Sequence, residues 1–340
     1  MLNIIFSIIN FILVLFLTKY FIYFSKKKKF FETANKFIKK KNKIPTAGGV
    51  VFISSFIILY LAGLLSDQFN FYELNRPYLV PVMLTILLAT SFLDDRFEIS
   101  SGLRFIIQST VVFISLPLIA YDFEYLPYKL GLLFTIYFWL LIINTSNFID
   151  GLDGMLSINV IFFCLQIFAI IFFRENENTN QVLIFITSLM LSSVLAFIIY
   201  NYPIAKLYMG DSGSIPLGYI IGFLMLQKLN LNDPYIIFFL FSYPITDVLA
   251  TIFIKTIIKK KLPWTRLFDY SFLQPVIKYK KEHSYVTNKI IFINFASLIL
   301  LILYLKFQNK YLILVNIAVN FFLLLLFNKK LSSRIMSKIN

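Results

Sequence analysis

Long apolar stretches alternate with short polar segments along the whole chain. A helix that crosses the hydrocarbon core of a bilayer needs about 20 apolar residues. Eleven stretches are candidates, and they are 3–24, 48–65, 77–93, 103–121, 130–147, 155–173, 181–200, 213–227, 235–254, 289–305 and 311–327. Several are short, notably 213–227, so we expect ten or eleven membrane helices. The pattern therefore predicts an all-α fold and a polytopic integral membrane protein.

The composition agrees with this class. Hydrophobic residues make up 59% of the 340 residues, 14% are charged, and the mean hydropathy is +0.79, which excludes an ordinary soluble domain. The lone cysteine, Cys164, excludes an internal disulfide and a cysteine-based metal site. The opening stretch, Met1 to Phe24, is too long for a signal-peptide core and has no charged leader, so we interpret it as the first membrane helix.

The basic residues are distributed unequally over the two sets of loops. One set holds 25 Lys and Arg residues and the other holds six. The richer set comprises 25–47, 94–104, 148–155, 201–212, 255–289 and 328–340. Because cytoplasmic loops carry the excess of Lys and Arg, the N-terminus is predicted on the periplasmic side and the C-terminus in the cytoplasm. The net charge of +15 is thereby explained by membrane lipid, and we expect no nucleic-acid partner.

The segment 144–154 carries polar residues directly between two apolar stretches. Asn144, Asn147, Asp150 and Asp153 all lie there. Charge at membrane depth is costly and usually lines a cavity or a site. The alternative is a polar turn, since Asn, Asp and Gly are ordinary turn residues. Further acidic residues at the same membrane face favour a site.

Those further acids end one apolar stretch and begin another. Asp94 and Asp95 follow the third stretch, and they repel each other unless a cation lies near. Arg96 offers one, and Mg²⁺ would be a stronger one. Asp211 precedes the small residues that open the eighth stretch, and a helix N-terminus favours phosphate. Asp247 lies inside the ninth stretch and is expected to pair with a base rather than face lipid.

Other candidates lie in loops on the same side. Lys43 precedes the turn 44–49, where it can face a phosphate or simply mark a helix entry. Tyr208 can stack on a base or belong to an interfacial aromatic belt. Arg266 and the only histidine, His283, lie in the long loop 255–289. A lone histidine is often only a loop residue, but its place beside the acids makes it a candidate.

Clustered oxygen ligands suit Mg²⁺, with Mn²⁺ as a substitute, and Mg²⁺ also binds phosphate oxygens. Membrane placement indicates that one substrate is a lipid. The reaction class that joins these features is phosphoryl transfer between a cytoplasmic nucleotide compound and a lipid phosphate.

Four segments in this order and spacing resemble the polyprenyl-phosphate N-acetylhexosamine-1-phosphate transferase family. They are 44–49, 94–96, 147–154 and 209–214. This family includes undecaprenyl-phosphate GlcNAc-1-phosphate transferases and the peptidoglycan phospho-MurNAc-pentapeptide translocase. The Asp94-Asp95-Arg96 form resembles the O-antigen-initiating branch more closely than the peptidoglycan enzyme.

The resemblance implies a single transmembrane transferase domain over 1–340, in the bacterial inner membrane, with its active site on the cytoplasmic face. A UDP-sugar and a polyprenyl phosphate would be the substrates, and a homodimer is a candidate assembly. Asp211 would bind Mg²⁺, and Asn147 would bind that metal or the nucleotide. Asp94 would orient or deprotonate the lipid phosphate, with Asp95 beside it.

The resemblance also implies nucleotide contacts. Asp150 and Asp153 would contact the uridine, Lys43 would lie near the nucleotide, and Tyr208 would stack on uracil. His283 would be catalytic and Arg266 would bind substrate. Relatives usually carry several histidines in the last long loop, whereas this chain keeps only His283, so the sugar contacts are open. A lipid or anion carrier is the alternative from another class, but no internal repeat supports it.

Overall fold

The structure is a computed structural model, and it describes residues 2–28, 44–66, 69, 71, 74–97, 99–119, 127–174, 181–229, 233–258, 260 and 270–328. Within these ranges every regular element is a helix and no β-strand occurs. The α-helices are α1 (Leu2–Lys27), α2 (Gly49–Leu65), α3 (Leu79–Phe97), α4 (Ser101–Ser115), α5 (Tyr128–Ile149), α6 (Met155–Arg174), α7 (Gln181–Asn201), α8 (Asp211–Leu229), α9 (Ser242–Phe253), α10 (Gln274–Tyr279), α11 (His283–Phe307) and α12 (Tyr311–Phe327). Shorter helical turns are η2 (Leu116–Leu118), η3 (Pro234–Phe238), η4 (Ile254–Ile258) and η5 (Ser271–Leu273).

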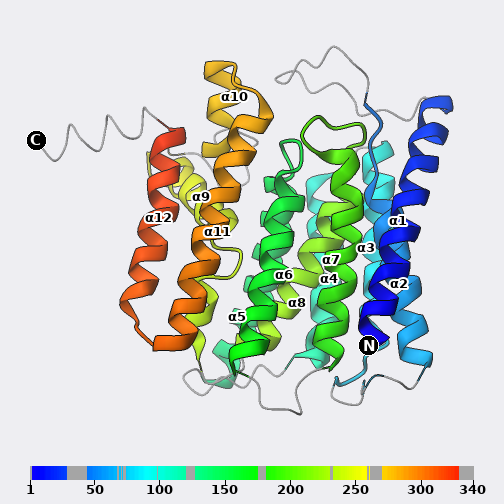
Figure 1. The fold of residues 1–340 in the computed structure, drawn as a ribbon, viewed down its shortest axis with the longest axis horizontal. Helices are drawn as coiled ribbons and strands as arrows, with labels where there is room; N and C mark the ends of the chain where they lie inside the picture. Colours follow the sequence, from blue (N-terminus) through cyan, green and yellow to red (C-terminus); the bar gives the residue numbers. More distant parts are fainter. Residues whose placement is uncertain are drawn as a thin grey trace, which may run out of the picture.

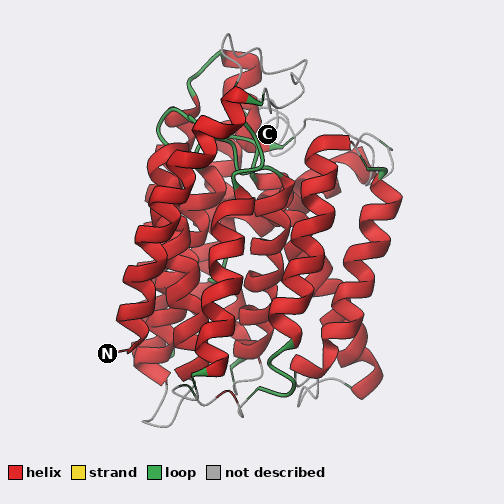
Figure 2. Ribbon diagram, turned by 90° about the vertical axis from the view of Figure 1, so that its right-hand side faces the viewer, coloured by secondary structure: helices red, strands yellow, loops and turns green. Residues whose placement is uncertain are grey.

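The helices stand side by side in one bundle (Figures 1 and 2). Each of the eleven predicted stretches overlaps one of these α-helices, as expected if every backbone polar group in lipid must be paired within its own helix. Among the described residues, six helical segments are long and apolar enough to cross a membrane, and α2 and α12 are shorter apolar helices. The predicted all-α membrane class is confirmed.

The two ends of the described chain lie at opposite ends of the bundle, where α1 begins and where α12 ends (Figure 1). This arrangement agrees with an odd number of crossings. Which end faces the cytoplasm stays a prediction from the basic residues, many of which fall in 29–43, 261–269 and 329–340, outside the described residues.

Helix α8 forms the centre of the bundle. Its residues 212–226 are all buried, and it packs against α2, α3 and α5. A helix that is apolar on every side is stable only when it is surrounded. On one side, the Trp139 indole of α5 stacks on Tyr219 with ring centres 4.9 Å apart, and its Nε1 donates to the Tyr219 carbonyl at 2.9 Å. The short stretch 213–227 is therefore a 19-residue helix that carries the site at its first turn.

The ninth predicted stretch, 235–254, is not one continuous helix. A 3-10 turn ends at Phe238, Phe241 has a left-handed backbone, and α9 begins at Ser242. Exposed backbone groups are tolerated at membrane depth only where protein satisfies them. Gln166 of α6 donates to the Phe239 carbonyl at 3.0 Å, and Asn316 of α12 donates to the Phe238 carbonyl at 2.8 Å. The break thus depends on side chains from distant helices.

Asp247 of α9 holds part of the last long loop against the bundle. Its carboxylate accepts hydrogen bonds from the backbone N–H groups of Ser271 and Phe272, at 3.0 and 3.1 Å. The hydroxyl groups of Tyr243 and Thr251 also donate to it. The sequence predicted a basic partner, whereas the structure provides backbone and hydroxyl donors that tie η5 to α9.

Candidate active site at one end of the bundle

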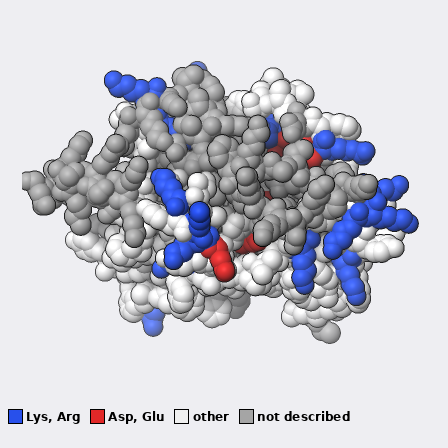
Figure 3. Space-filling view, turned by 90° about the horizontal axis from the view of Figure 1, so that it is seen from above, with Lys and Arg blue, Asp and Glu red and all other residues white. Residues whose placement is uncertain are grey.

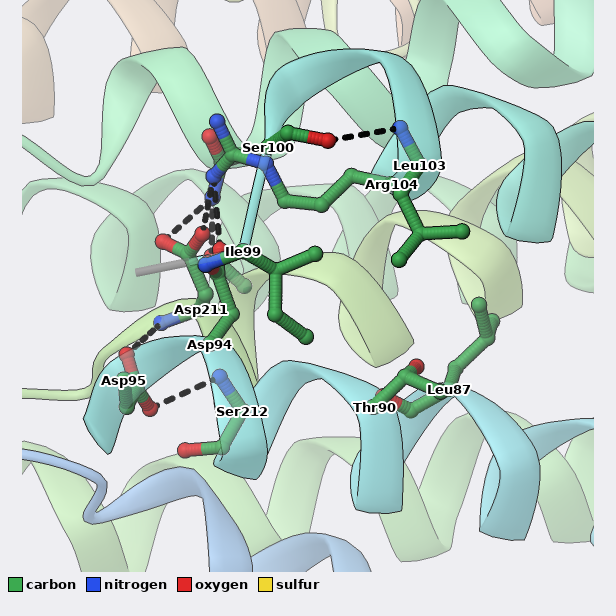
Figure 4. A network of polar contacts seen from close by, with 12 residues as sticks. Leu87, Thr90, Asp94, Asp95, Ile99, Ser100, Leu103, Arg104, Asp211 and Ser212 are labelled. Atoms are coloured by element: carbon green, nitrogen blue, oxygen red, sulfur yellow. Dashed lines mark hydrogen bonds and ion pairs between the residues drawn. The ribbon is translucent and has the colours of Figure 1, made fainter. Parts of the chain in front are cut away.

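The two neighbouring carboxylates at the end of α3 have different partners. Asp94 is buried, and its Oδ1 accepts from the Ile99 N–H at 2.6 Å, which fixes the tight connection to α4. Asp95 turns the other way, toward the start of α8 (Figure 4). Consecutive residues on a helix point in different directions, so one Asp-Asp pair reaches two elements.

Arg104 lies between Asp94 and Asp211. Its Nη1 is 2.7 Å from Asp94 Oδ2 and 2.9 Å from Asp211 Oδ2, so one guanidinium nitrogen joins α3, α4 and α8 (Figure 4). The sequence indicated Arg96 as the cation beside the two acids, and that expectation is wrong. The Arg96 side chain is exposed, with its guanidinium 5.4 Å from the Phe97 ring centre.

Arg104 was not among the site residues predicted from the sequence. Its signal was nonetheless present, because Arg104 is the only charged residue in the apolar stretch 103–121. A charge within such a stretch is expected to face the bundle interior and to pair.

The first turn of α8 is hydrogen-bonded to two other helices. Asp95 Oδ1 accepts the Asp211 N–H at 2.9 Å, and Asp95 Oδ2 accepts the Ser212 N–H at 3.1 Å. A carboxylate there pairs with free N–H groups and with the positive end of the helix dipole. From α5, Asn147 Nδ2 donates to Asp211 Oδ1 at 2.8 Å and to Ser214 Oγ at 3.1 Å. Residues from α3, α4, α5 and α8 thus form one network.

Glycines allow this close convergence. Gly210 has a φ of +72°, and a Cβ there would lie 2.6 Å from Asp95 Oδ2. A Cβ on Gly49 would lie 2.0 Å from the backbone nitrogen of Gly213, so α2 and α8 meet backbone to backbone. Glycine is the residue that permits both a positive φ and so close an approach.

The predicted turn 44–49 packs beside the segment that precedes α8. The N–H groups of Gly48 and Gly49 donate to the carbonyls of Tyr208 and Met209, both at 2.9 Å. The Tyr208 N–H donates to the Pro45 carbonyl at 2.9 Å. Two of the four recognised segments are therefore joined by backbone hydrogen bonds, and the half-buried Tyr208 lies at the junction.

Asp153 and His283 form a second group. His283 Nδ1 is 3.1 Å from Asp153 Oδ1, and Asp153 Oδ2 accepts the Ala205 N–H at 3.1 Å. Thr287 of α11 donates to the Asp153 carbonyl. The buried Asp153 thus links α11 to the connection between α7 and α8.

Three other site residues were predicted from the sequence, namely Asp150, Lys43 and Arg266. Asp150 is half-buried and occupies the C-cap position of α5. Lys43 and Arg266 lie outside the described residues.

The network carries three carboxylates and one guanidinium, which leaves an excess of negative charge. In the described part of the chain, no set of three His, Cys, Asp or Glu residues holds a metal ion by itself. Mg²⁺, however, is usually bound by one or two carboxylates, with water and substrate phosphate completing the octahedron. Asp94 Oδ2 and Asp211 Oδ2 already converge on one point, now held by a cationic nitrogen, so the donor set fits Mg²⁺.

The face around this network is basic. Viewed from this end of the molecule, Lys and Arg side chains are more frequent than acidic ones among the residues drawn in colour (Figure 3). Exposed examples are Lys26, Lys27, Lys28, Arg96, Lys206, Lys278, Lys280 and Lys281. A basic surface around a small acidic centre suits a polyanionic ligand that brings or shares a cation.

The site is thus a polar network of acids, an amide and an arginine at one end of a helical membrane bundle. Residues 78–228 match the model of glycosyl transferase family 4, and the chain belongs to this family. The resemblance seen in the four sequence segments is thereby confirmed.

Curated relatives cover most of the chain. The phospho-N-acetylmuramoyl-pentapeptide-transferase of Nitratiruptor sp. is 33% identical over 255 residues, which is 63% of this chain and 70% of the relative. The protein of that name from Helicobacter acinonychis is 28% identical over 323 residues, or 83% of this chain and 86% of the relative. A probable undecaprenyl-phosphate N-acetylglucosaminyl 1-phosphate transferase of Bacillus subtilis is 32% identical over 202 residues, or 55% of this chain and 52% of the relative.

Proposed function

We propose that the protein transfers a sugar-1-phosphate, of the N-acetylhexosamine type, from a UDP-sugar to a polyprenyl phosphate and releases UMP. The observation that carries the proposal is the convergence of Asp94, Asp95, Arg104, Asn147 and Asp211 into one network at the end of an apolar bundle. Family membership and the names of the relatives point to the same chemistry.

The reaction exchanges one phosphoanhydride for another. An oxygen of the lipid phosphate attacks the β-phosphorus of the UDP-sugar, and the bond from that phosphorus to the oxygen of the α-phosphate breaks. UMP leaves with this oxygen. Because one phosphoanhydride bond replaces another, the free energy of the reaction is close to zero. Phosphoryl transfer of this kind depends on positioning and charge neutralisation. Bound Mg²⁺ would neutralise the diphosphate, and Asp211 would hold it with Asp94 or Asn147.

We assign three further roles to residues of the two groups. Asp94 lies beside Arg104, so it is placed to orient a lipid phosphate that the arginine attracts. Asp150 and Tyr208 are half-buried at the same end and are our candidates for nucleotide contacts. Asp153 uses its carboxylate inside the protein, so we assign it a positioning role toward His283 rather than a uridine contact.

Phospho-MurNAc-pentapeptide transfer is the second candidate. The specific observation in its favour is that relatives with that name match up to 83% of this chain. The Asp94-Asp95-Arg96 form and the single histidine favour the first candidate. Both candidate reactions require a bacterial inner membrane, with the site on its cytoplasmic face. The product of the first candidate reaction would start a lipid-linked cell-surface polysaccharide such as lipopolysaccharide.

The test uses the purified protein in detergent with undecaprenyl phosphate and Mg²⁺. UDP-GlcNAc, other UDP-N-acetylhexosamines and UDP-MurNAc-pentapeptide are supplied separately, and both UMP release and the mass of the lipid product are measured. We expect a product with a UDP-N-acetylhexosamine. A product with UDP-MurNAc-pentapeptide alone would establish the second candidate, and no UMP from any donor would exclude both.

The matched variants are Asp211→Asn and Asp233→Asn. Asp211→Asn should lower turnover about a hundredfold or more, the size expected when one group that stabilises transferred charge is lost. Asp233 is also a buried acid, but it pairs with Arg174 and Tyr304 in a separate network. Asp233→Asn should therefore lower stability and leave the turnover of each folded molecule unchanged.

A further inference from the structure

The position of the Arg104 guanidinium points to a role that a static ion pair does not explain. A single nitrogen, Nη1, contacts Asp94 Oδ2 at 2.7 Å and Asp211 Oδ2 at 2.9 Å. These two oxygens come from different helices, α3 and α8. Both acids are among the residues that would hold Mg²⁺ under the proposed function. Two positive charges do not occupy one such position together, because their repulsion at that distance is large.

We propose that Arg104 is a built-in substitute for the divalent cation. It holds Asp94 and Asp211 together while the cation is absent, and cation binding displaces it. This inference rests on the proposed function for the nature of the cation. Arg104 is therefore a positioning residue that competes with the cation in the unliganded protein and becomes a free positive charge beside the site once the cation is bound.

The carboxylates explain why such a substitute is needed. Asp95 also lies beside Asp211, whose backbone N–H it accepts at 2.9 Å. Without a cation, three carboxylates would repel one another at the start of α8. Arg104 relieves this repulsion, so the helix ends stay in place between catalytic cycles.

The surroundings of Arg104 also allow it to move. The side chain is partly exposed, with a relative exposure of 23%, and borders a small hollow of about 10 Å³ between α3, α4 and α8. Leu87, Thr90, Ile107 and Ile215 line this hollow. Because the Arg104 side chain already reaches solvent, a displaced guanidinium can turn outward without entering the packed core.

The experiment measures Mn²⁺ binding alone, without nucleotide or lipid phosphate. Free Mn²⁺ is followed by electron paramagnetic resonance during titration of the full chain in detergent. Arg104→Gln should bind Mn²⁺ about tenfold more tightly or better than the unchanged protein, because one opposing unit charge is removed. Arg96→Gln is the matched control, since this exposed arginine lies at the same end, and its Mn²⁺ affinity should be unchanged.

Equal or weaker Mn²⁺ binding by folded Arg104→Gln overturns the proposal, since a purely structural arginine predicts that result. Folding is checked by melting temperature in Mn²⁺ and in EDTA, and we expect a larger rise with Mn²⁺ for Arg104→Gln than for the unchanged protein. A variant that stays unfolded even with Mn²⁺ also overturns the proposal, because the cation should replace the lost charge. Since UMP release is not measured here, a failure of this inference is distinct from a failure of the proposed function.

Discussion

Asp95 offers a quantitative test of how the site is held together. Its two oxygens accept the N–H groups of Asp211 and Ser212 at 2.9 and 3.1 Å, so one side chain from α3 caps the start of α8. Asp95→Ala removes both acceptors, whereas Asp95→Asn keeps one oxygen and loses the charge. The matched control is Arg96→Ala, a change at the next residue whose side chain is exposed.

The expected cost follows from the two hydrogen bonds. Each bond to a charged acceptor contributes about 1.5–3 kcal/mol. Removal of Asp95 also ends its repulsion with Asp211, which offsets part of the loss. We therefore expect Asp95→Ala to lose roughly 2–4 kcal/mol and Asp95→Asn about half of that. Arg96→Ala should stay within about 0.5 kcal/mol of the unchanged protein.

The single cysteine provides the assay. Cys164 of α6 is fully buried, so a thiol-reactive fluorescent dye reports the opening of the core around it. Melting temperatures in one detergent should fall in the order unchanged protein, Asp95→Asn, Asp95→Ala. The reasoning would be refuted if Asp95→Ala had the same melting temperature as the unchanged protein, or if Asp95→Asn had a lower melting temperature than Asp95→Ala.

Two further changes test the packing around the site. Gly49→Ala should prevent stable folding, because its Cβ would lie 2.0 Å from the Gly213 nitrogen. Gly102→Ala has nothing within 4 Å of its Cβ, so this variant should melt at or slightly above the temperature of the unchanged protein. Equal dye-monitored melting temperatures of the two variants would contradict this expectation. Asp247→Ala should free the backbone N–H groups of residues 271–272 and raise their hydrogen-exchange rate about tenfold or more. Mass spectrometry measures this rate. An unchanged rate would show that other contacts hold η5.

The helices could be located from the sequence because a membrane helix is a local property. The apolar length and the internal hydrogen bonds of each stretch suffice to define it. The break at Phe241 was not predictable in this way, since Gln166 and Asn316 satisfy the freed carbonyls from α6 and α12. A run of apolar residues looks the same whether or not distant side chains replace its missing backbone bonds.

The candidate site was found in part. Asp94, Asp95, Asn147 and Asp211 were recognised because polar groups at the ends of apolar stretches are costly unless they serve a site. Arg104 was missed because Arg96 is adjacent to the acids in sequence and explained their charge equally well. The lateral packing of α3, α4 and α8 decided between the two arginines.

By itself, the sequence determined that the chain is a helical membrane protein, and it determined which polar residues collect at the ends of its helices. Both follow from the order of apolar and polar residues, since depth in a membrane is a one-dimensional property. The tertiary structure alone decided that Asp94 and Asp211 share Arg104, that Asp95 caps α8, and that Asp153 holds His283. Such partnerships depend on how each helix is rotated and placed against its neighbours, which close contacts such as that between Gly49 and Gly213 fix.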